Sequence, residues 1–244
     1  MTNVNTRHQQ ESSLFFFFRR SARTTILCFL IAYGAVFPTQ TVTAEYRDTL
    51  WDIVTTCLDT RAQDYCSQCP APRIESPCAQ GRGCKETTEV WEETTEFVII
   101  RDRKMCGCPD GFVHGLVIPR ARIKGIEDPQ RPKGIWSVAW AMARKRIGDA
   151  TAIALVVNPP GTRSQDQLHV HIVRLRSDSR PLFDAAKVTR VRSLDDVWSE
   201  AAKKAARANL KKYGVLVTPN LDGDFLVVVE DASLEKLYTQ WECR

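Results

Sequence analysis

The chain of 244 residues has little net charge and few histidines. Its formal charge of +5 at pH 7 is too small to argue for nucleic-acid binding, although it suits an anionic substrate or an anionic membrane surface. Because the whole chain holds only four histidines, two of them placed two residues apart are a specific feature. The length and apolar content are those of an ordinary globular protein, with one sizeable domain or one domain and a small appendage.

The sequence also lacks an apolar run that would cross a bilayer comfortably. The run "ILCFLIAYGAVF", residues 26–37, follows the arginines of "FFFFRRSARTT". Val42 and Ala44 are small residues at the positions that signal peptidase reads. Residues 1–44 are therefore predicted to be a signal peptide, with a retained signal anchor as the alternative, because tilt could extend the run. Both interpretations predict an exported domain, periplasmic or anchored to the membrane and facing the periplasm or exterior.

Cysteine usage agrees with export. Cys28 lies in the leader, and its removal leaves eight of the nine cysteines, an even number in a compartment that favours oxidation. We therefore expect structural disulfides. Metal binding is the alternative, because Cys66 and Cys69 have zinc-ribbon spacing, but their candidate partners form a C-x-C pair. We expect Cys243, close to the end of the chain, to bond to Cys57 in the N-terminal helix.

The pattern along the rest of the chain predicts an α+β fold. Helical spacing occurs in "YRDTLWDIVTTCL", in "IWSVAWAMARKRIG", where a tryptophan-bearing core stripe ends at Gly148, and in a helix capped by Ser193 that runs to Gly214. A loop dense in Cys, Pro and Gly follows the first helix. Strand patterns occur in "EFVIIRD", "GFVHGLVIP", "TAIALVVN", "DQLHVHIVRL", "VLVTP" and "DFLVVVE". The segment "PPGTRSQD" predicts a hairpin between the third and fourth of these strands.

The histidine pair lies in "DQLHVHIVRL", where polar and apolar residues alternate. This alternation places Gln167, His169 and His171 on one strand face and turns the intervening residues toward a core. Imidazole and amide groups gain little from burial unless they are hydrogen-bonded, so the polar face predicts a site or a polar cover. A catalytic or phosphate-binding role, a zinc site and two structural histidines are the open interpretations. We expect the remaining candidate, His114, to pack rather than to react.

Several segments together resemble a known family. The succession "GFVHGLVIPRARIKGIEDP", a Trp-bearing helix, "ALVVN", a short polar loop and "QLHVHIV" is similar to the histidine-triad (HIT-like) superfamily and, within it, to CDP-diacylglycerol pyrophosphatases. "SPCA" and a cysteine near the C-terminus extend the resemblance over most of the chain after the leader. It implies a HIT-like antiparallel sheet with packed helices, a disulfide-stapled N-terminal helix and Cys-rich segment over 45–110, and a catalytic domain over 111–244. The superfamily pattern is His-φ-His-φ-His-φ-φ, and here Gln167 stands at its first position.

The resemblance implies a hydrolase that cleaves CDP-diacylglycerol to CMP and phosphatidate. His169 matches the histidine that forms a nucleotidyl-histidine intermediate, and His171 matches the one that touches phosphate oxygens or the leaving group. The residues demand no metal and no other cofactor. A lipid-linked nucleotide and a membrane surface are the implied partners. The alternatives are a nucleotidyl hydrolase or transferase for a soluble CDP-alcohol or nucleotide sugar, and a catalytically lapsed nucleotide-binding module.

Other residues match positions that contact substrate in the superfamily. Asn158, Ser164 and Gln165 stand where its polar loop meets phosphate and nucleotide, and Gln167 can still donate an amide hydrogen bond. Arg163 is either a phosphate contact or a solvated loop residue. A second basic cluster, predicted to border the substrate pocket, could also be an exposed strand end; it consists of Arg120, Arg122 and Lys124.

Overall fold

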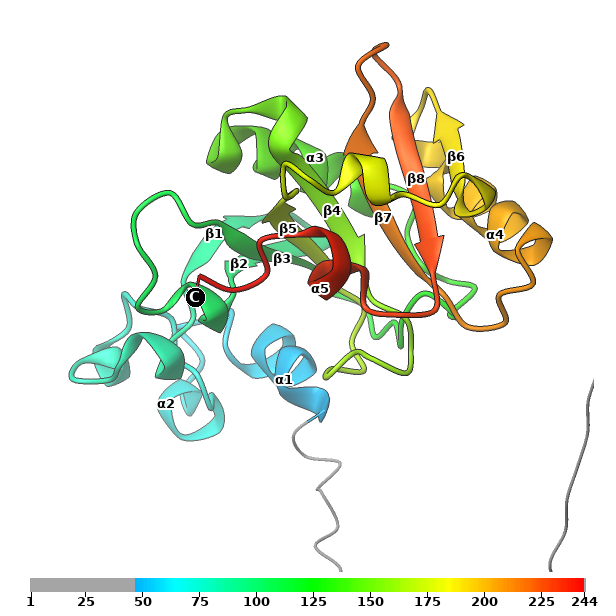
Figure 1. Cartoon of the computed structure of the whole chain (residues 1–244). Coiled ribbons are helices and arrows are strands. Elements are labelled where there is room, and N and C mark those ends of the chain that lie inside the picture. The colour runs from blue at the N-terminus through cyan, green and yellow to red at the C-terminus, as the bar shows by residue number, and fades with distance from the viewer. Residues whose placement is uncertain (1–46, 244) are drawn as a thin grey trace, which may run out of the picture. The chain divides into compact units, whose positions relative to one another are not determined.

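Eight strands form one antiparallel sheet in the order β1-β2-β3-β5-β4-β7-β8-β6 (Figure 1). The structure, a computed structural model, describes residues 47–243, so the predicted leader over 1–44 lies outside the described residues. The fold is α+β, as predicted. The strands are β1 (Val90–Glu93), β2 (Phe97–Arg101), β3 (His114–Pro119), β4 (Ile153–Val157), β5 (Val170–Arg174), β6 (Val188–Val191), β7 (Gly214–Pro219) and β8 (Phe225–Glu230).

The histidine strand lies inside the sheet. β4 and β5 form the predicted antiparallel pair, and β3 borders the other edge of β5. His171 lies opposite Leu116 on β3 and Val156 on β4. Because side chains alternate along a strand, Val170 and Ile172 enter the main core, while His171 points to the opposite face. The strand begins at Val170, so His169 is fixed immediately before it.

Two helices cover the face that holds the main core (Figure 1). They are α3 (Ile135–Ile147) and α4 (Val197–Arg207). The predicted tryptophan stripe is confirmed, because Trp136 is fully buried and packs on Trp198 with ring centroids 4.7 Å apart. Helix α3 ends at Gly148, whose φ of 75° is a conformation that glycine adopts without a steric penalty.

The opposite face of the sheet is covered in two separate parts. Near β2 and β3, apolar residues pack beneath α1 (Thr49–Thr56) and the Cys-rich segment with α2 (Tyr65–Gln68). Near β4, β7 and β8, a second cluster packs beneath α5 (Leu234–Tyr238). The histidine side of β5 lies between these two clusters, so the covering layer leaves space above it.

Four disulfides join the eight cysteines of the described chain, which confirms the disulfide prediction over the metal alternative. The pairs are Cys57–Cys69, Cys66–Cys78, Cys84–Cys106 and Cys108–Cys243. The predicted Cys57–Cys243 bond is wrong. After α5 the chain runs along β5, where Gln240 N–H donates to the Arg174 carbonyl at 2.8 Å, and this path brings Cys243 to Cys108. The disulfides indicate an oxidising, exported environment.

Element boundaries differ from the prediction in the last third of the chain. Ser193 does cap the helical segment, by accepting a hydrogen bond from Asp195 N–H, but α4 ends at Arg207. Asn209, with φ of 55°, terminates the helical path before Gly214. Strands β1 and β6 and helices α2 and α5 were not predicted; α2 lies in the Cys-rich segment that was predicted to be a loop. Within residues 47–243, no helix has the length and apolar character that a membrane crossing requires.

Candidate functional site

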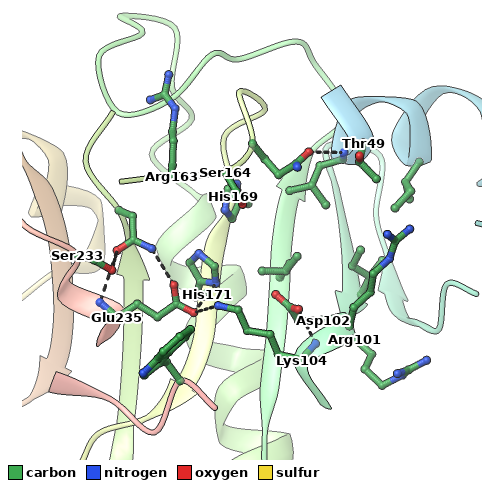
Figure 2. A pocket seen from close by; sticks show the side chains of 18 of the residues that line it. Thr49, Arg101, Asp102, Lys104, Arg163, Ser164, His169, His171, Ser233 and Glu235 are labelled. Atoms are coloured by element: carbon green, nitrogen blue, oxygen red, sulfur yellow. Dashed lines mark hydrogen bonds and ion pairs between the residues drawn. The ribbon is translucent and has the colours of Figure 1, made fainter. Parts of the chain in front are cut away.

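A cavity of about 380 Å³ opens above β5, between α1 and α5 (Figure 2). Its walls combine apolar side chains from α1, β2 and β3 with charged side chains from the segment after β2 and from α5. Six of the predicted site residues line it: Asn158, Arg163, Ser164, Gln165, His169 and His171. The other wall residues that bear on the chemistry are Thr49, 101–104, Ser233, Glu235, Lys236 and Trp241.

His169 presents one defined ring nitrogen to this cavity. Its Nδ1 lies 2.8 Å from the carbonyl oxygen of Gln167, which can only accept a hydrogen bond. Nδ1 therefore carries the proton and the lone pair resides on Nε2, at the far side of the ring. Burial lowers the pKa of His169 below its usual 6.5, so the neutral imidazole persists at neutral pH. A neutral imidazole with a free Nε2 is a competent nucleophile.

His171 belongs to a buried polar cluster that forms part of the cavity wall. Its Nδ1 lies 3.0 Å from Nε2 of His114, and that Nε2 lies 3.2 Å from Oε1 of Glu235. Burial holds the pKa of His171 well below its usual value. Burial alone would raise the pKa of Glu235, but His171, His114 and Lys104 lower it far below its usual range. Glu235 is therefore an ionised carboxylate that is nearly inaccessible to solvent.

The Glu235 carboxylate is held from several sides. Lys104 Nζ donates to Oε1, and Asn158 Nδ2 donates to Oε2 at 2.8 Å. The side-chain Oδ1 of Asn158 accepts a hydrogen bond from the Ser233 hydroxyl at 3.0 Å, which ties the start of α5 to the end of β4. Asn158 thus lines the cavity, where its side-chain amide orients Glu235.

The polar loop between β4 and β5 mainly fixes the cavity wall. Arg163 makes a bidentate ion pair with Glu127, at 2.7 and 2.6 Å, and lies 3.4 Å from Asp166. Its guanidinium charge is thus balanced inside the protein. Gln165 Oε1 accepts a hydrogen bond from Leu50 N–H at 3.1 Å and so ties the loop to α1. A paired hydrogen bond from Arg47 lowers the pKa of Asp166 to about 2, which keeps this carboxylate ionised.

Four predicted residues do not line the cavity in the described part of the chain. Gln167 is fully buried behind it, where Nε2 donates to the carbonyls of Pro119 and Ala121 at 2.9 and 2.7 Å. It therefore fastens the segment that follows β3. Arg120 pairs with Glu93, Arg122 pairs with Asp48, and Lys124 lines a separate surface hollow.

Sequence reasoning missed Asp102, Lys104, Glu235 and the backbone of Trp241. Asp102 and Lys104 lie within three residues of the end of the strand pattern "EFVIIR", so polar residues at a strand end were an available signal. Glu235 looks like an ordinary acidic residue in the first turn of a helix capped by Ser233. Nothing in its local sequence distinguishes it from a solvated carboxylate.

Asp102, His114 and His171 place one ligand atom each within 4.8 Å of one another, a spacing that could suit a metal ion. Here, however, the facing imidazole nitrogens of His114 and His171 hydrogen-bond to each other. The ammonium of Lys104 lies against Glu235 at the same place and would repel a cation. The donor set therefore fits shared protons better than a metal.

Comparison with known proteins gives consistent results. A family model described as "CDP-diacylglycerol pyrophosphatase" matches residues 45–208. A CDP-diacylglycerol pyrophosphatase from Yersinia pestis is 26% identical over 174 residues, which cover 57% of this chain and 65% of the relative. One from Mycobacterium bovis is 38% identical over 81 residues, or 29% of this chain and 30% of the relative. The alignments thus span less than two thirds of each relative, and α5 lies beyond the segment that the family model matches.

Proposed function

Since this chain belongs to the CDP-diacylglycerol pyrophosphatase family, we propose that it hydrolyses the pyrophosphate bond of CDP-diacylglycerol to give CMP and phosphatidate. The observation that carries this proposal is His169, a neutral imidazole with Nε2 directed into a cavity of about 380 Å³. We further propose that the sheet belongs to the HIT-like superfamily and that the domain acts in the periplasm or on its membrane surface.

The proposed reaction has two displacements. Nε2 of His169 attacks the phosphorus of the CMP unit, a P–N bond forms, and the P–O bond to phosphatidate breaks. Water then attacks the same phosphorus, breaks the P–N bond and releases CMP. In such transfers the protein mainly positions the groups and neutralises phosphate charge. His171, which lines the cavity beside His169, is the proposed partner of the leaving oxygen.

Cationic side chains at the cavity support an anionic substrate. Arg103 and Lys236 line it, and both side chains are exposed to solvent. Ser164 and Gln165 remain proposed contacts for the nucleotide phosphate. Leu237 is exposed next to Lys236 on α5, and this pairing of apolar and basic side chains suits the surface of an anionic bilayer.

The substrate class can be tested by measuring CMP release from CDP-diacylglycerol in anionic vesicles and from a soluble CDP-alcohol. We expect kcat/KM to be higher for the lipid by at least about 10-fold, because membrane attraction concentrates enzyme and substrate at one surface. Equal turnover of both substrates would favour the soluble-nucleotide alternative. CMP binding without release of CMP from either substrate would indicate a lapsed nucleotide-binding module.

The pH dependence of the reaction should follow the protonation of His169. Burial lowers the pKa of this group, so its neutral, nucleophilic form persists below pH 6.5, the usual value for imidazole. We expect kcat/KM to stay constant as the pH falls to 6.5 and to decline only below it. Measurement of kcat/KM between pH 4 and 9, about the range in which carboxylates and imidazoles titrate, shows at which pH this decline begins. A decline that begins above pH 6.5 would contradict the assignment of the nucleophile.

A further inference from the structure

The polar loop between β4 and β5 carries a buried arginine that is directed away from the two histidines. The side chain of Arg163 is only 6% exposed, and Figure 2 shows it pointing away from His169 and His171. Its guanidinium donates to both carboxylate oxygens of Glu127, in the segment that follows β3. This pair therefore fastens the loop to another part of the chain instead of presenting the positive charge to a ligand.

Gly125 provides the space in which this ion pair lies. A Cβ atom on Gly125 would overlap Nη1 of Arg163, and it would lie 2.9 Å from the Arg163 Cζ and 2.7 Å from Oε2 of Glu127. Gly125 does not have a positive φ, so its backbone conformation does not require glycine. The requirement is for space, because any larger residue would displace the guanidinium.

The ion pair continues into a chain of four alternating charges. Asp166 lies 3.4 Å from Arg163, and its carboxylate accepts two hydrogen bonds from Arg47, at 2.9 and 2.7 Å. The backbone N–H of Asp166 donates to the Arg47 carbonyl at 2.9 Å, just before α1, whose Leu50 lines the cavity. The charges of Glu127, Arg163, Asp166 and Arg47 sum to zero, and Arg163 is the most buried of them. Arg163 is thus the centre of a network that joins three segments.

Ser164 directly follows Arg163 and lines the cavity. Within residues 47–243, neither its hydroxyl nor its backbone N–H has a hydrogen-bond acceptor, and both are donors that suit phosphate oxygens. His169 is held separately, because the N–H of the preceding Leu168 donates to the Ile123 carbonyl at 2.6 Å. A shift of Arg163 should therefore move Ser164 without moving the nucleophile.

We propose that Arg163, held by Glu127 over Gly125, is a positioning residue that presents the two free donors of Ser164 to the nucleotide phosphate. This role rests on the proposed function and gives Arg163 no contact with the substrate. The donors would bind the phosphate in the ground state and in the transition state alike. Loss of such uniform binding raises KM and leaves kcat unchanged.

Two variants disturb the network in different ways. Glu127→Gln keeps the size of the side chain and removes its charge, whereas Gly125→Ala keeps every charge and occupies the space of the guanidinium. In both we expect the KM for CDP-diacylglycerol and the Kd for CMP to rise by about 10-fold, which is the loss of one hydrogen bond to a charged group. The kcat should stay within about 3-fold of the wild-type value. The Kd for cytidine, which lacks the phosphate, should not change. Steady-state kinetics and titration calorimetry measure these constants.

Each variant has a matched control outside the cavity wall. Gly134→Ala adds the same methyl group where no atom lies within 4 Å, at a residue with a φ of −64°. Glu92→Gln removes a carboxylate that pairs with Lys145 and is 40% exposed, compared with 39% for Glu127. We expect both controls to keep the wild-type Kd for CMP. If Glu127→Gln and Gly125→Ala weaken CMP and cytidine equally, or lower only the midpoint of thermal unfolding, the positioning role is wrong and the ion pair is structural.

The same measurements separate failure of this role from failure of the proposed function. Wild-type protein that binds CMP but releases none from CDP-diacylglycerol would reject the hydrolase, and a weaker affinity of both variants for CMP would still support the positioning role. Wild-type KM values in both variants, with normal CMP release, would overturn the positioning role and leave the hydrolase intact. A wild-type protein that neither binds nor releases CMP would reject both.

Discussion

Replacement of His169 with alanine is expected to lower kcat by at least on the order of 10⁴-fold, as removal of a nucleophile does in other covalent enzymes. Nε2 of His169 is the atom proposed to bond to phosphorus, and alanine offers no replacement. The fold should survive, because the imidazole faces a cavity and makes its one defined hydrogen bond to the Gln167 carbonyl, two residues earlier in the segment that leads into β5. The kcat for CMP release and the midpoint of thermal unfolding measure the two effects.

The control for this variant is chemical trapping. Wild-type protein quenched during turnover of substrate labelled in the CMP phosphate should retain an acid-labile label, and His169→Ala should retain none. His171→Ala keeps the nucleophile, so it should still acquire the label, with kcat reduced by on the order of 100-fold. Full activity of His169→Ala would rule out the covalent route.

The part of the site that could be predicted from sequence depends on local periodicity. Alternating residues in "DQLHVHIVRL" place His169 and His171 on one face, and the turn signals before them predict the hairpin that β4 and β5 form. Such patterns predict the secondary structure of a segment and the face on which each of its side chains lies, within one or two elements. The main core beneath α3 was predictable for the same reason.

The rest of the site depends on contacts between distant segments. Glu235 reaches His171 only because α5 packs on β4 and β7, and nothing in "SLEKL" reports that packing. The interpretation of Arg163 likewise required its partner Glu127, which lies 36 residues away. Gln167 stands where the superfamily pattern has its first histidine, which suggests a lost catalytic group, but its side-chain amide hydrogen-bonds to the backbone after β3. In each case the chemistry of a side chain depends on a partner that periodicity does not identify.

Disulfide connectivity shows the same limit. An even set of cysteines predicts bonds, but which sulfurs meet depends on the path of the chain around the sheet. Cys243 reaches Cys108 because the C-terminal segment follows β5, an arrangement that also places the Trp241 carbonyl on His114. The Cys108–Cys243 bond therefore fixes the C-terminal segment to the segment before β3, and this segment carries Trp241, which lines the cavity.

Replacement of both Cys108 and Cys243 with alanine is therefore expected to reduce both stability and turnover. The bond closes a loop with a sequence separation of 135, and the other three disulfides lie outside this loop. Loop-closure entropy gives a loss of roughly 5 kcal/mol in the free energy of unfolding. Freeing the C-terminus should also loosen the Trp241 carbonyl and lower kcat by about 10-fold, because misplaced catalytic groups lose rate steeply. Denaturant titration and CMP release measure the two losses.

The matched control replaces Cys66 and Cys78, which close a loop with a sequence separation of 12 in the Cys-rich segment and do not line the cavity. Its shorter loop gives an expected loss of roughly 3 kcal/mol, with kcat unchanged. Comparison of the two variants at a temperature where both remain folded separates the positioning effect from general destabilisation. If the Cys108/Cys243 variant keeps the wild-type kcat while folded, the C-terminal segment does not depend on this bond to place the Trp241 carbonyl. If both variants lose kcat equally, the loss reflects weakened folding, and the bond has no specific part in positioning His114.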